Sequence, residues 1–249
     1  MQLLTDGLVL REQAAGESDR LITVLTRSSG VVRAFARGAR NLKNKSAAAT
    51  QTLSYSEFSI FCGRESNTID SADVKKVFFG VRQDLNRLTL AQYFCELGAA
   101  LSPQEENAED YLRLLLNALH FLENGSRPPR IIKAAVEMRI MALSGYLPDL
   151  VGCSGCGCYE SDPMYFSLKG GVITCSKCRR PDGGPTAVLT PGVLAALRHT
   201  VYAPFFKLFS FELSEEGQRL LESASERYVL NQLERSFKTL DFYRRVAQT

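Results

Sequence analysis

The side chains best suited to chemistry in this sequence are cysteines arranged as two C-x-x-C pairs. The first pair is Cys153 and Cys156, the second is Cys175 and Cys178, and eighteen residues lie between them. A gap of two residues lets both thiolates of a pair turn toward one ion, and two pairs complete a tetrahedron. Gly157 follows the first pair, where a knuckle often needs a backbone conformation that glycine adopts cheaply. The pattern predicts one structural Zn²⁺ per chain, because four protein thiolates leave no position open for water.

Other arrangements of the cysteines stay open at this point. The chain has seven cysteines, and an odd number without a visible secretion signal favours a metal site over a disulfide framework. The alternative is that the four cysteines are reduced or oxidised without a metal. Cys158 lies close enough in sequence to replace Cys156 as a ligand. Cys62 and Cys95 lie in apolar runs, which is typical of ordinary buried thiols.

A second feature is a run of positive charge in the amino-terminal part of the chain. No acidic residue occurs between Asp19 and Glu57. The net charge is only +3, and from residue 86 onward eighteen basic side chains balance eighteen acidic ones, so the positive charge is local. A local basic field attracts polyanions such as nucleic acid. The alternative is a basic face that is merely solvated.

The segment 31–37 makes the nucleic-acid interpretation more specific. Strand alternation puts Arg33, Phe35 and Arg37 on one face and the small or apolar residues between them on the other. Single-strand grooves use such a pattern, with arginines on phosphates and an aromatic ring stacked on a base. In the alternative, Phe35 points into the core and the arginines lie on a solvated rim. The predicted DNA-binding residues are Arg20, Arg27, Arg33, Phe35, Arg37, Arg40, Lys43 and Lys45.

The elements that must position these residues begin with a β-rich region, which extends to about residue 80. Short β-prone runs near residues 8–10, 21–26, 31–37, 53–62 and 68–74 predict a small barrel or sandwich. Ser29 and Gly30 predict a hairpin turn between the second and third runs. The segment 41–51 is rich in Lys, Ser, Ala and Asn, which predicts a mobile loop with little to bury.

The rest of the chain shows helical spacing, interrupted once. Apolar periodicity predicts helices around residues 90–101, 112–119 and 132–143, the last ended by Gly145. Residues 148–185, rich in Cys, Gly and Pro, predict a small module built around something other than an apolar core. Thr190 and Pro191 predict the start of a helix that runs to about residue 200, and a last helical region covers about 215–247.

The predicted architecture is therefore a multidomain α+β fold. A β-barrel domain covers residues 1–80, and a helical domain covers residues 81–249 with the four-cysteine module 148–185 inserted. No P-loop, nucleophile elbow or dinucleotide fingerprint is present, and neither histidine begins an H-x-E motif, so we expect no enzymatic activity. No signal peptide or apolar run of membrane-spanning length is visible, which predicts a cytoplasmic protein.

The order of these parts resembles the family of the DNA repair protein RecO. The residues that carry the resemblance are Gly7-Leu8-Val9-Leu10, Gly16-Glu17-Ser18-Asp19-Arg20-Leu21, Thr26-Arg27-Ser28-Ser29-Gly30, Ala36-Arg37-Gly38-Ala39-Arg40, Gly145-Tyr146-Leu147-Pro148-Asp149-Leu150, Cys153 and Cys156-Gly157. Each motif alone is moderately specific, but their order and spacing extend over essentially the whole chain.

The resemblance implies a recombination mediator with an OB-type barrel. It implies binding to single- and double-stranded DNA, annealing of complementary strands and association with the nucleoid. It also implies partnership with RecR and single-strand binding protein, and help in loading RecA onto coated single strands. A protein-only adaptor, which docks repair partners through its helices and cysteine module, is the alternative that the residues leave open.

Overall fold

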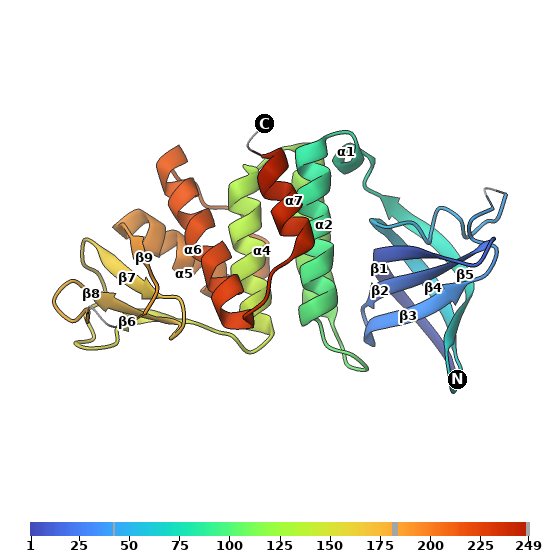
Figure 1. Cartoon of the computed structure of the whole chain (residues 1–249), viewed down its shortest axis with the longest axis horizontal. Coiled ribbons are helices and arrows are strands. Elements are labelled where there is room, and N and C mark those ends of the chain that lie inside the picture. Colours follow the sequence, from blue (N-terminus) through green and yellow to red (C-terminus); the bar gives the residue numbers. More distant parts are fainter. Residues whose placement is uncertain (42, 181–183, 248–249) are drawn as a thin grey trace. The chain divides into compact units, whose positions relative to one another are not determined.

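The computed structural model describes residues 1–41, 43–180 and 184–247. Its packing divides the chain into two compact units (Figure 1). The barrel unit is Met1–Asn124 together with Phe237–Thr249, and the metal unit, named for its four cysteines that could bind a metal ion, is Gly125–Ser236. The sequence-based division at residue 80 follows the change from strand to helix instead, and it stays a prediction.

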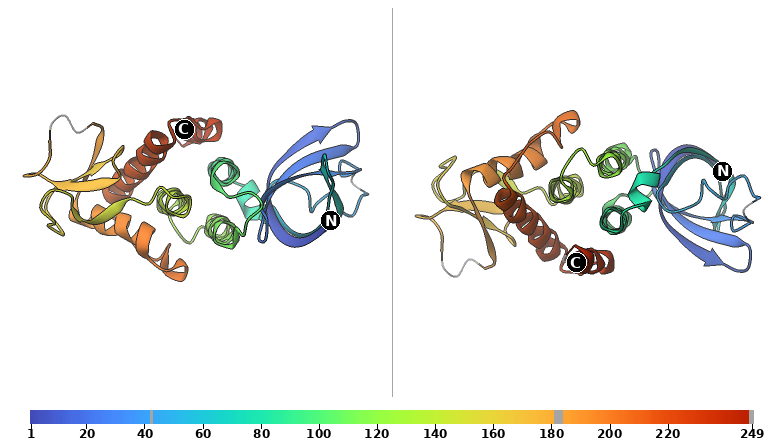
Figure 2. Two further views of the ribbon diagram at one scale, coloured as in Figure 1. Left: turned by 90° about the horizontal axis from the view of Figure 1, so that it is seen from below. Right: turned by 90° about the horizontal axis from the view of Figure 1, so that it is seen from above.

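The barrel unit is built on five strands that close into a ring. They are β1 (Gln2–Ala15), β2 (Asp19–Thr26), β3 (Gly30–Ala36), β4 (Ser54–Cys62) and β5 (Asn67–Val77). The order around the closed barrel is β1-β2-β3-β5-β4, and only β3 and β5 pair in parallel. Figures 1 and 2 show these strands curving around a common interior. This is the OB-type barrel that the sequence predicted, and all five strands lie where their β-prone runs predicted them.

Strand alternation explains the core of the barrel. Successive side chains of a strand point to opposite faces, so in a closed barrel every second residue points into the interior and is almost fully buried. The residues between them face solvent or a helix. The inward residues include Val9, Ile22, Val24, Ala34, Phe58 and Ile60. On β3 the inward positions are the alanines at 34 and 36, which leaves Arg33, Phe35 and Arg37 exposed, as the alternation predicted. The alternative in which Phe35 enters the core is therefore wrong.

The loop between β3 and β4 is more ordered in its packing than the sequence suggested. Ala49 and Thr50 are fully buried, and Ala47 is 6% exposed. Ala39 and Ala49 belong to the core of the barrel. The prediction of a loop over residues 41–51 is confirmed for its described residues, but the prediction that it has little to bury is wrong. Small alanine side chains fill the space beside the barrel that larger side chains could not enter.

Helices complete the barrel unit. They are α1 (Phe79–Arg82), α2 (Leu85–Leu101), α3 (Glu109–Asn124) and α7 (Lys238–Val246). Helices α2 and α3 pack on β1 and β2, and α7 packs on α2. Phe237, just before α7, is fully buried and meets the Tyr93 ring edge-on at 5.8 Å. This last helix therefore belongs with the first half of the chain.

The metal unit combines helices with a small open sheet. Its helices are α4 (Pro129–Leu143), α5 (Pro191–Tyr202) and α6 (Glu215–Leu233), with a short 3-10 turn η1 (Phe205–Lys207). Its strands are β6 (Asp149–Cys153), β7 (Met164–Ser167), β8 (Val172–Cys175) and β9 (Thr186–Leu189), in the order β6-β8-β7-β9. As predicted, Gly145 with φ +90° follows α4, and the Thr190 side chain caps α5.

Two sequence-based predictions for this unit need correction. The module 148–185 does have apolar side chains to bury: Phe166 and Ile173 are fully buried, and the Phe166 ring lies 5.0 Å from that of Tyr228 on α6. The last helical region is two helices, because the backbone at Glu234 turns to φ +48° and ends α6. None of the described helices is both long and apolar enough to cross a membrane.

Candidate nucleic-acid interface and metal centre

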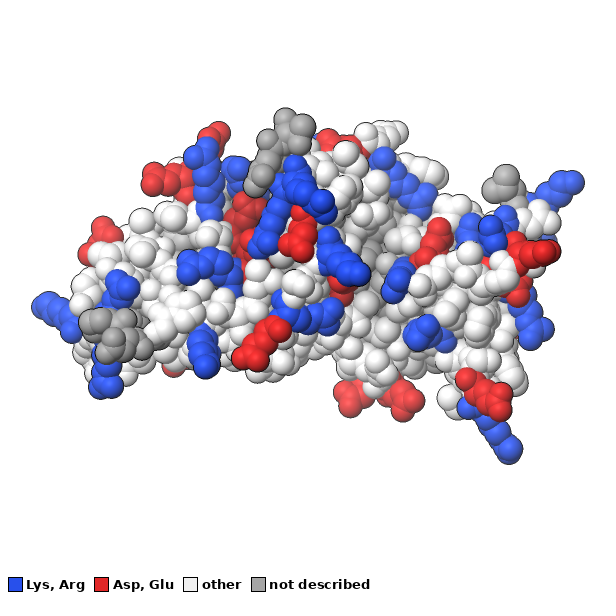
Figure 3. All heavy atoms as spheres, in the orientation of Figure 1, with Lys and Arg blue, Asp and Glu red and all other residues white. Residues whose placement is uncertain are grey.

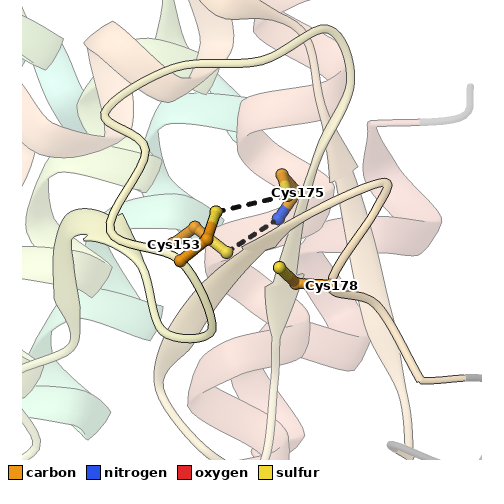
Figure 4. Close-up of side chains that lie close together, drawn as sticks. Cys153, Cys175 and Cys178 are labelled. Atoms are coloured by element: carbon orange, nitrogen blue, oxygen red, sulfur yellow. Dashed lines mark hydrogen bonds between the residues drawn. The ribbon is translucent and has the colours of Figure 1, made fainter.

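The two C-x-x-C pairs meet at one end of the small sheet. Cys153 ends β6, Cys175 ends β8, and their partners Cys156 and Cys178 lie on the turns that follow. Figure 4 shows the labelled side chains of Cys153, Cys175 and Cys178 gathered around one point. The four sulfur atoms lie within 4.8 Å of one another. The arrangement is the one the sequence predicted.

The sulfur spacing fits a tetrahedral metal. The Sγ atoms of Cys156 and Cys175 lie 3.8 Å apart. A tetrahedron with metal–sulfur bonds of about 2.3 Å has edges of about 3.8 Å, so one ion can reach these sulfur atoms. A disulfide needs about 2.05 Å between sulfur atoms, and all seven cysteines are free. The four cysteines could therefore bind a metal ion, whereas the oxidised alternative does not fit.

Glycines make both turns of the cluster possible. Gly157 has φ +74°, the left-handed conformation predicted for it, and no atom lies within 4 Å of an added Cβ. Gly155 acts differently: an added Cβ would lie 2.8 Å from the Cβ of Cys178. Because Gly155 has no side chain, the turn that carries Cys178 can pack directly against it. The sequence did not predict this role, because residues 155 and 178 are far apart in the chain and no local pattern around Gly155 indicates that they meet.

Electrostatics also favours a cation at this centre. Burial alone would raise the pKa of Cys153, but N–H groups of Cys175, Gly155 and Cys156 outweigh burial and lower that pKa to about 6. The pKa of Cys178 is raised to about 12, first by the thiol of Cys156 and then by those of Cys175 and Cys153. Four negative sulfur atoms repel one another at this spacing, so they ionise together only around a cation.

Cys158 lies beside the centre but outside the group of four. The four sulfur atoms that share one point are those of the two predicted pairs. The pKa of the Cys158 thiol is raised to about 12, first because of its hydrogen bond with Cys156 and then because of burial. Because Cys156 is one of those four and Cys158 is not, the geometry favours Cys156 over Cys158 as a ligand.

The exposed face of β3 lines a groove on the barrel unit. The groove has a volume of about 770 Å³, and Arg33 and Phe35 are among its lining residues. Phe35 is 37% exposed, so its ring is reachable from solvent. The opposite lip comes from the segment after α2, including Gln104 and Glu105. This groove brings together one cation and one aromatic ring from the predicted DNA-binding set.

The segment after α2 is held against the β2–β3 hairpin by backbone hydrogen bonds. The N–H of Val31 donates to the carbonyl of Pro103 at 2.8 Å, and the N–H of Glu105 donates to that of Ser29 at 3.1 Å. An added Cβ on Gly30 would lie 2.0 Å from the Pro103 carbonyl oxygen. Gly30 is therefore required by this contact as well as by the predicted turn, where its φ is +62°.

A second group of predicted residues lies on the turn and loop after β3. Arg37, Arg40, Lys43 and Lys45 are all exposed. The Asp19 carboxylate accepts a hydrogen bond from the Gly38 N–H at 2.7 Å, and this bond lowers the pKa of Asp19. Asp19, which sequence reasoning did not assign a role, thus positions the basic turn.

Arg40 and Arg20 lie together around a smaller hollow. Both line a cavity of about 270 Å³ on the barrel unit. The Arg40 guanidinium donates to the Gly16 carbonyl at 2.9 Å. Arg20 is only 14% exposed and donates to the Ala47 carbonyl at 2.7 Å, so its guanidinium holds the loop. A DNA-binding role for Arg20 stays a prediction.

Arg27 is occupied by carboxylates. It makes two hydrogen bonds to Asp6, at 2.8 and 2.7 Å, and one to Glu109 at 2.8 Å. The Tyr55 hydroxyl donates to the same Asp6 carboxylate. The Arg27 guanidinium is the main reason that the pKa of Asp6 is lowered. Arg27 therefore joins β1, β2 and α3 within the barrel unit, and its predicted contact with DNA is untested.

Two family models match the chain. The model described as Recombination protein O N terminal matches residues 1–78, and the one described as Recombination protein O C terminal matches residues 82–241. A DNA repair protein RecO from Acetivibrio thermocellus is 38% identical over 96% of this chain and 95% of its own length. The RecO proteins of Symbiobacterium thermophilum and Dehalococcoides mccartyi are 32% and 30% identical, each over at least 94% of both chains.

Proposed function

The chain belongs to the recombination protein O family of DNA repair proteins, and from this premise we propose that it is a DNA-binding recombination mediator. It acts in recombinational repair by holding strands and partner proteins, without active-site chemistry of its own. The barrel unit is the DNA-binding part. The observation that carries this proposal is the exposure of Arg33 and Phe35 on the outer face of β3 and of Arg37 directly after it.

The predicted DNA-binding residues lie in three different environments, and we assign each group a different role. Arg33 and Phe35 line the groove, where a ring can stack on a base beside a phosphate contact. Arg37, Arg40, Lys43 and Lys45 extend the positive surface along the turn and loop, and neutralise further phosphates. Arg20 and Arg27 shape the barrel unit, because protein groups already hold their guanidinium groups.

Charge neutralisation explains how such a surface would anneal DNA. Two complementary strands repel each other through their phosphates, and a basic surface that binds either strand lowers this repulsion when they meet. The same surface binds single- and double-stranded DNA, since phosphate contacts carry no sequence information. Affinity falls with salt, with a logarithmic slope of about −0.7 per phosphate contact on single strands.

Partner proteins complete the proposed role. We propose that the chain works with RecR and single-strand binding protein, and through them helps load RecA onto coated single strands. The family supports these partnerships, and the helices of the metal unit offer surface for them. The partner-binding residues are left unassigned.

The metal is proposed to be one structural Zn²⁺ held by Cys153, Cys156, Cys175 and Cys178. The donor set and the 3.8 Å sulfur spacing support zinc, which prefers tetrahedral thiolate sites. Four protein ligands leave no open position, so the ion stabilises the module and takes no part in a reaction. The apolar contact of Phe166 with α6 shares this stabilising task.

Fluorescence annealing of complementary oligonucleotides coated with single-strand binding protein tests the proposal. It is run with and without RecR at two salt concentrations, with the parent chain and with the double substitution Arg37→Ala and Arg40→Ala. We expect the double variant to bind single strands about tenfold more weakly and to anneal more slowly, with little sequence dependence. Parent-like binding by the variant at equal salt would refute the assignment. RecR binding without any DNA binding would favour a protein-only adaptor.

A further inference from the structure

The metal unit contains a short segment that is locally basic. It is not apparent from the charge count after residue 86, because basic and acidic side chains are equal in number over that whole region. Between Asp162 and Asp182 the chain has four basic and no acidic side chains. They are Lys169, Lys177, Arg179 and Arg180, and all four are exposed. None of them forms an ion pair with a described residue. Figure 3 shows Lys and Arg side chains over the part of the metal unit that carries the small sheet.

The small sheet has one covered face and one open face. Its inner residues, such as Phe166 and Ile173, are buried, and Phe166 packs on α6. Its outer residues alternate with these. Tyr165 on β7 pairs with Thr174 on β8 and with Val188 on β9, so the three side chains lie side by side on the outer face. Val188 is 51% exposed, whereas Tyr165 and Thr174 are half-buried, so the outer face is open to solvent at β9 and partly covered at β7 and β8.

A guanidinium lies on this outer face over the ring of Tyr165. The Arg179 guanidinium carbon is 4.1 Å from the centre of the Tyr165 ring. The turn at residues 175–179 holds the backbone of Arg179 in place, since the N–H groups of Cys178 and Arg179 both donate to the Cys175 carbonyl, at 3.1 and 3.0 Å. Arg180 follows directly. The turn that carries Cys175 and Cys178 thus also positions Arg179, and Arg180 beside it is exposed.

We propose that the outer face of β7, β8 and β9 is a second surface for a single nucleic-acid strand. Lys177, Arg179 and Arg180 meet phosphates, and the Tyr165–Arg179 stack meets a base. An open sheet face with an aromatic ring and neighbouring cations is a common way of binding unpaired bases, which have two free faces. An acidic polypeptide would use the charges alone and leave the ring and open strands unexplained.

This inference goes beyond the proposed function, which assigns DNA binding to the barrel unit alone. Each unit would then carry its own strand-binding surface. The surface on the metal unit depends on the turn at residues 175–179, and this turn depends on a metal bound by Cys175 and Cys178. The surface on the barrel unit contains no metal ligand and does not depend on the metal. Two surfaces on one chain would let it hold two strands at once, which is a requirement of annealing.

Four proteins test the inference by their affinity for a labelled oligothymidine at two salt concentrations. They are the parent, the barrel variant Arg37→Ala/Arg40→Ala, the sheet variant Arg179→Ala/Arg180→Ala, and the combination of all four substitutions. In the barrel-variant background we expect the sheet substitutions to weaken residual binding about tenfold and to flatten the salt dependence. Unchanged residual binding, or no residual binding to begin with, overturns the inference. A barrel variant that binds like the parent instead refutes the proposed function.

Matched controls separate a binding role from damage to the module. The substitutions Lys207→Ala and Arg219→Ala also remove two exposed positive charges from the metal unit, and should leave residual binding within about twofold of the barrel variant. Tyr165→Phe should retain binding, and Tyr165→Leu should weaken it about fivefold. Every variant must keep its bound metal. If the sheet variant loses a labelled oligoglutamate peptide but keeps its DNA affinity, the surface serves acidic polypeptides and the inference fails.

Discussion

The two sheets of this chain bury their apolar side chains in different ways. The five strands of the barrel unit pair in a closed ring, so their inward residues enclose one another, and β3 and β5 close the ring through two residue pairs. The four strands of the metal unit form an open sheet, with one face on α6 and four cysteines at one end. The barrel therefore encloses its own core, whereas the small sheet depends on a helix on one face and has, at one end, a cysteine cluster that could bind a metal ion.

The comparison also concerns how each sheet presents positive charge. The exposure of Arg33 on β3 follows from strand alternation, Arg37 lies on the turn directly after that strand, and both need only the closed barrel. On the small sheet Arg179 stands over Tyr165 because the knuckle after Cys175 turns it there. The first surface should therefore survive loss of the metal, and the second should not.

The largest expected effect comes from removing a metal ligand. Cys175→Ser should reduce bound metal from about one per chain to less than a tenth, and remove stabilisation on the order of 10 kcal/mol from the module. Hydrogen exchange measured by mass spectrometry should show faster exchange in β6–β9 and unchanged exchange in β1–β5. Cys62→Ser, outside the cluster, is the matched control and should keep the metal. Equal loosening of both sheets would break the comparison.

A smaller effect is expected from the contact that holds the segment after α2 on the barrel. Gly30→Ala should lower the free energy of unfolding by about 3 kcal/mol, because its Cβ meets the Pro103 carbonyl and its φ is +62°. Gly16→Ala has a similar φ of +70° but open space, and should cost only about 1 kcal/mol. Denaturant unfolding of both variants measures the difference. Equal costs would mean that the contact does not matter.

The smallest effect concerns the ion pairs of Arg27. Asp6→Asn should cost about 2 kcal/mol at neutral pH, because it weakens two charge-assisted hydrogen bonds. The folded state lowers the pKa of Asp6 below its ordinary value of 3.8, so the carboxylate stabilises the fold above that pH. This stabilisation is lost as the pH falls through the folded pKa.

Denaturant midpoints of the parent and the Asp6→Asn variant, measured between pH 2 and pH 7, should therefore converge toward the acid end of the range. Asp73→Asn removes an exposed carboxylate from β5 and serves as the control. A gap between parent and variant that stays constant with pH would contradict the assigned role of Asp6.

Local patterns made much of this structure predictable. A period of two placed Arg33, Phe35 and Arg37 outside the barrel, and the C-x-x-C spacing predicted the cluster that the cysteines form. Thr190 and Gly145 predicted a helix start and a helix end through their own backbone chemistry. Each of these signals depends on neighbours within a few residues, which a single sequence displays directly.

Long-range contacts account for what was missed. The ion pairs of Arg27 with Asp6 and Glu109 were not foreseen because these partners are distant in sequence, and its predicted contact with DNA stays a prediction. Strands β6–β9 have only four or five residues each, too few for alternation to stand out. The basic run around Arg179 was hidden because charges were summed over more than half of the chain. Such features need the fold before they can be recognised.

The position of α7 has a consequence for synthesis. Helix α7 packs on α2, and Phe237 meets Tyr93, yet the whole metal unit is translated between these partners. On the ribosome, the segment 125–236 has emerged before the last helix of the barrel unit exists. The metal unit can therefore mature first, while the α2 surface waits uncovered for the end of translation.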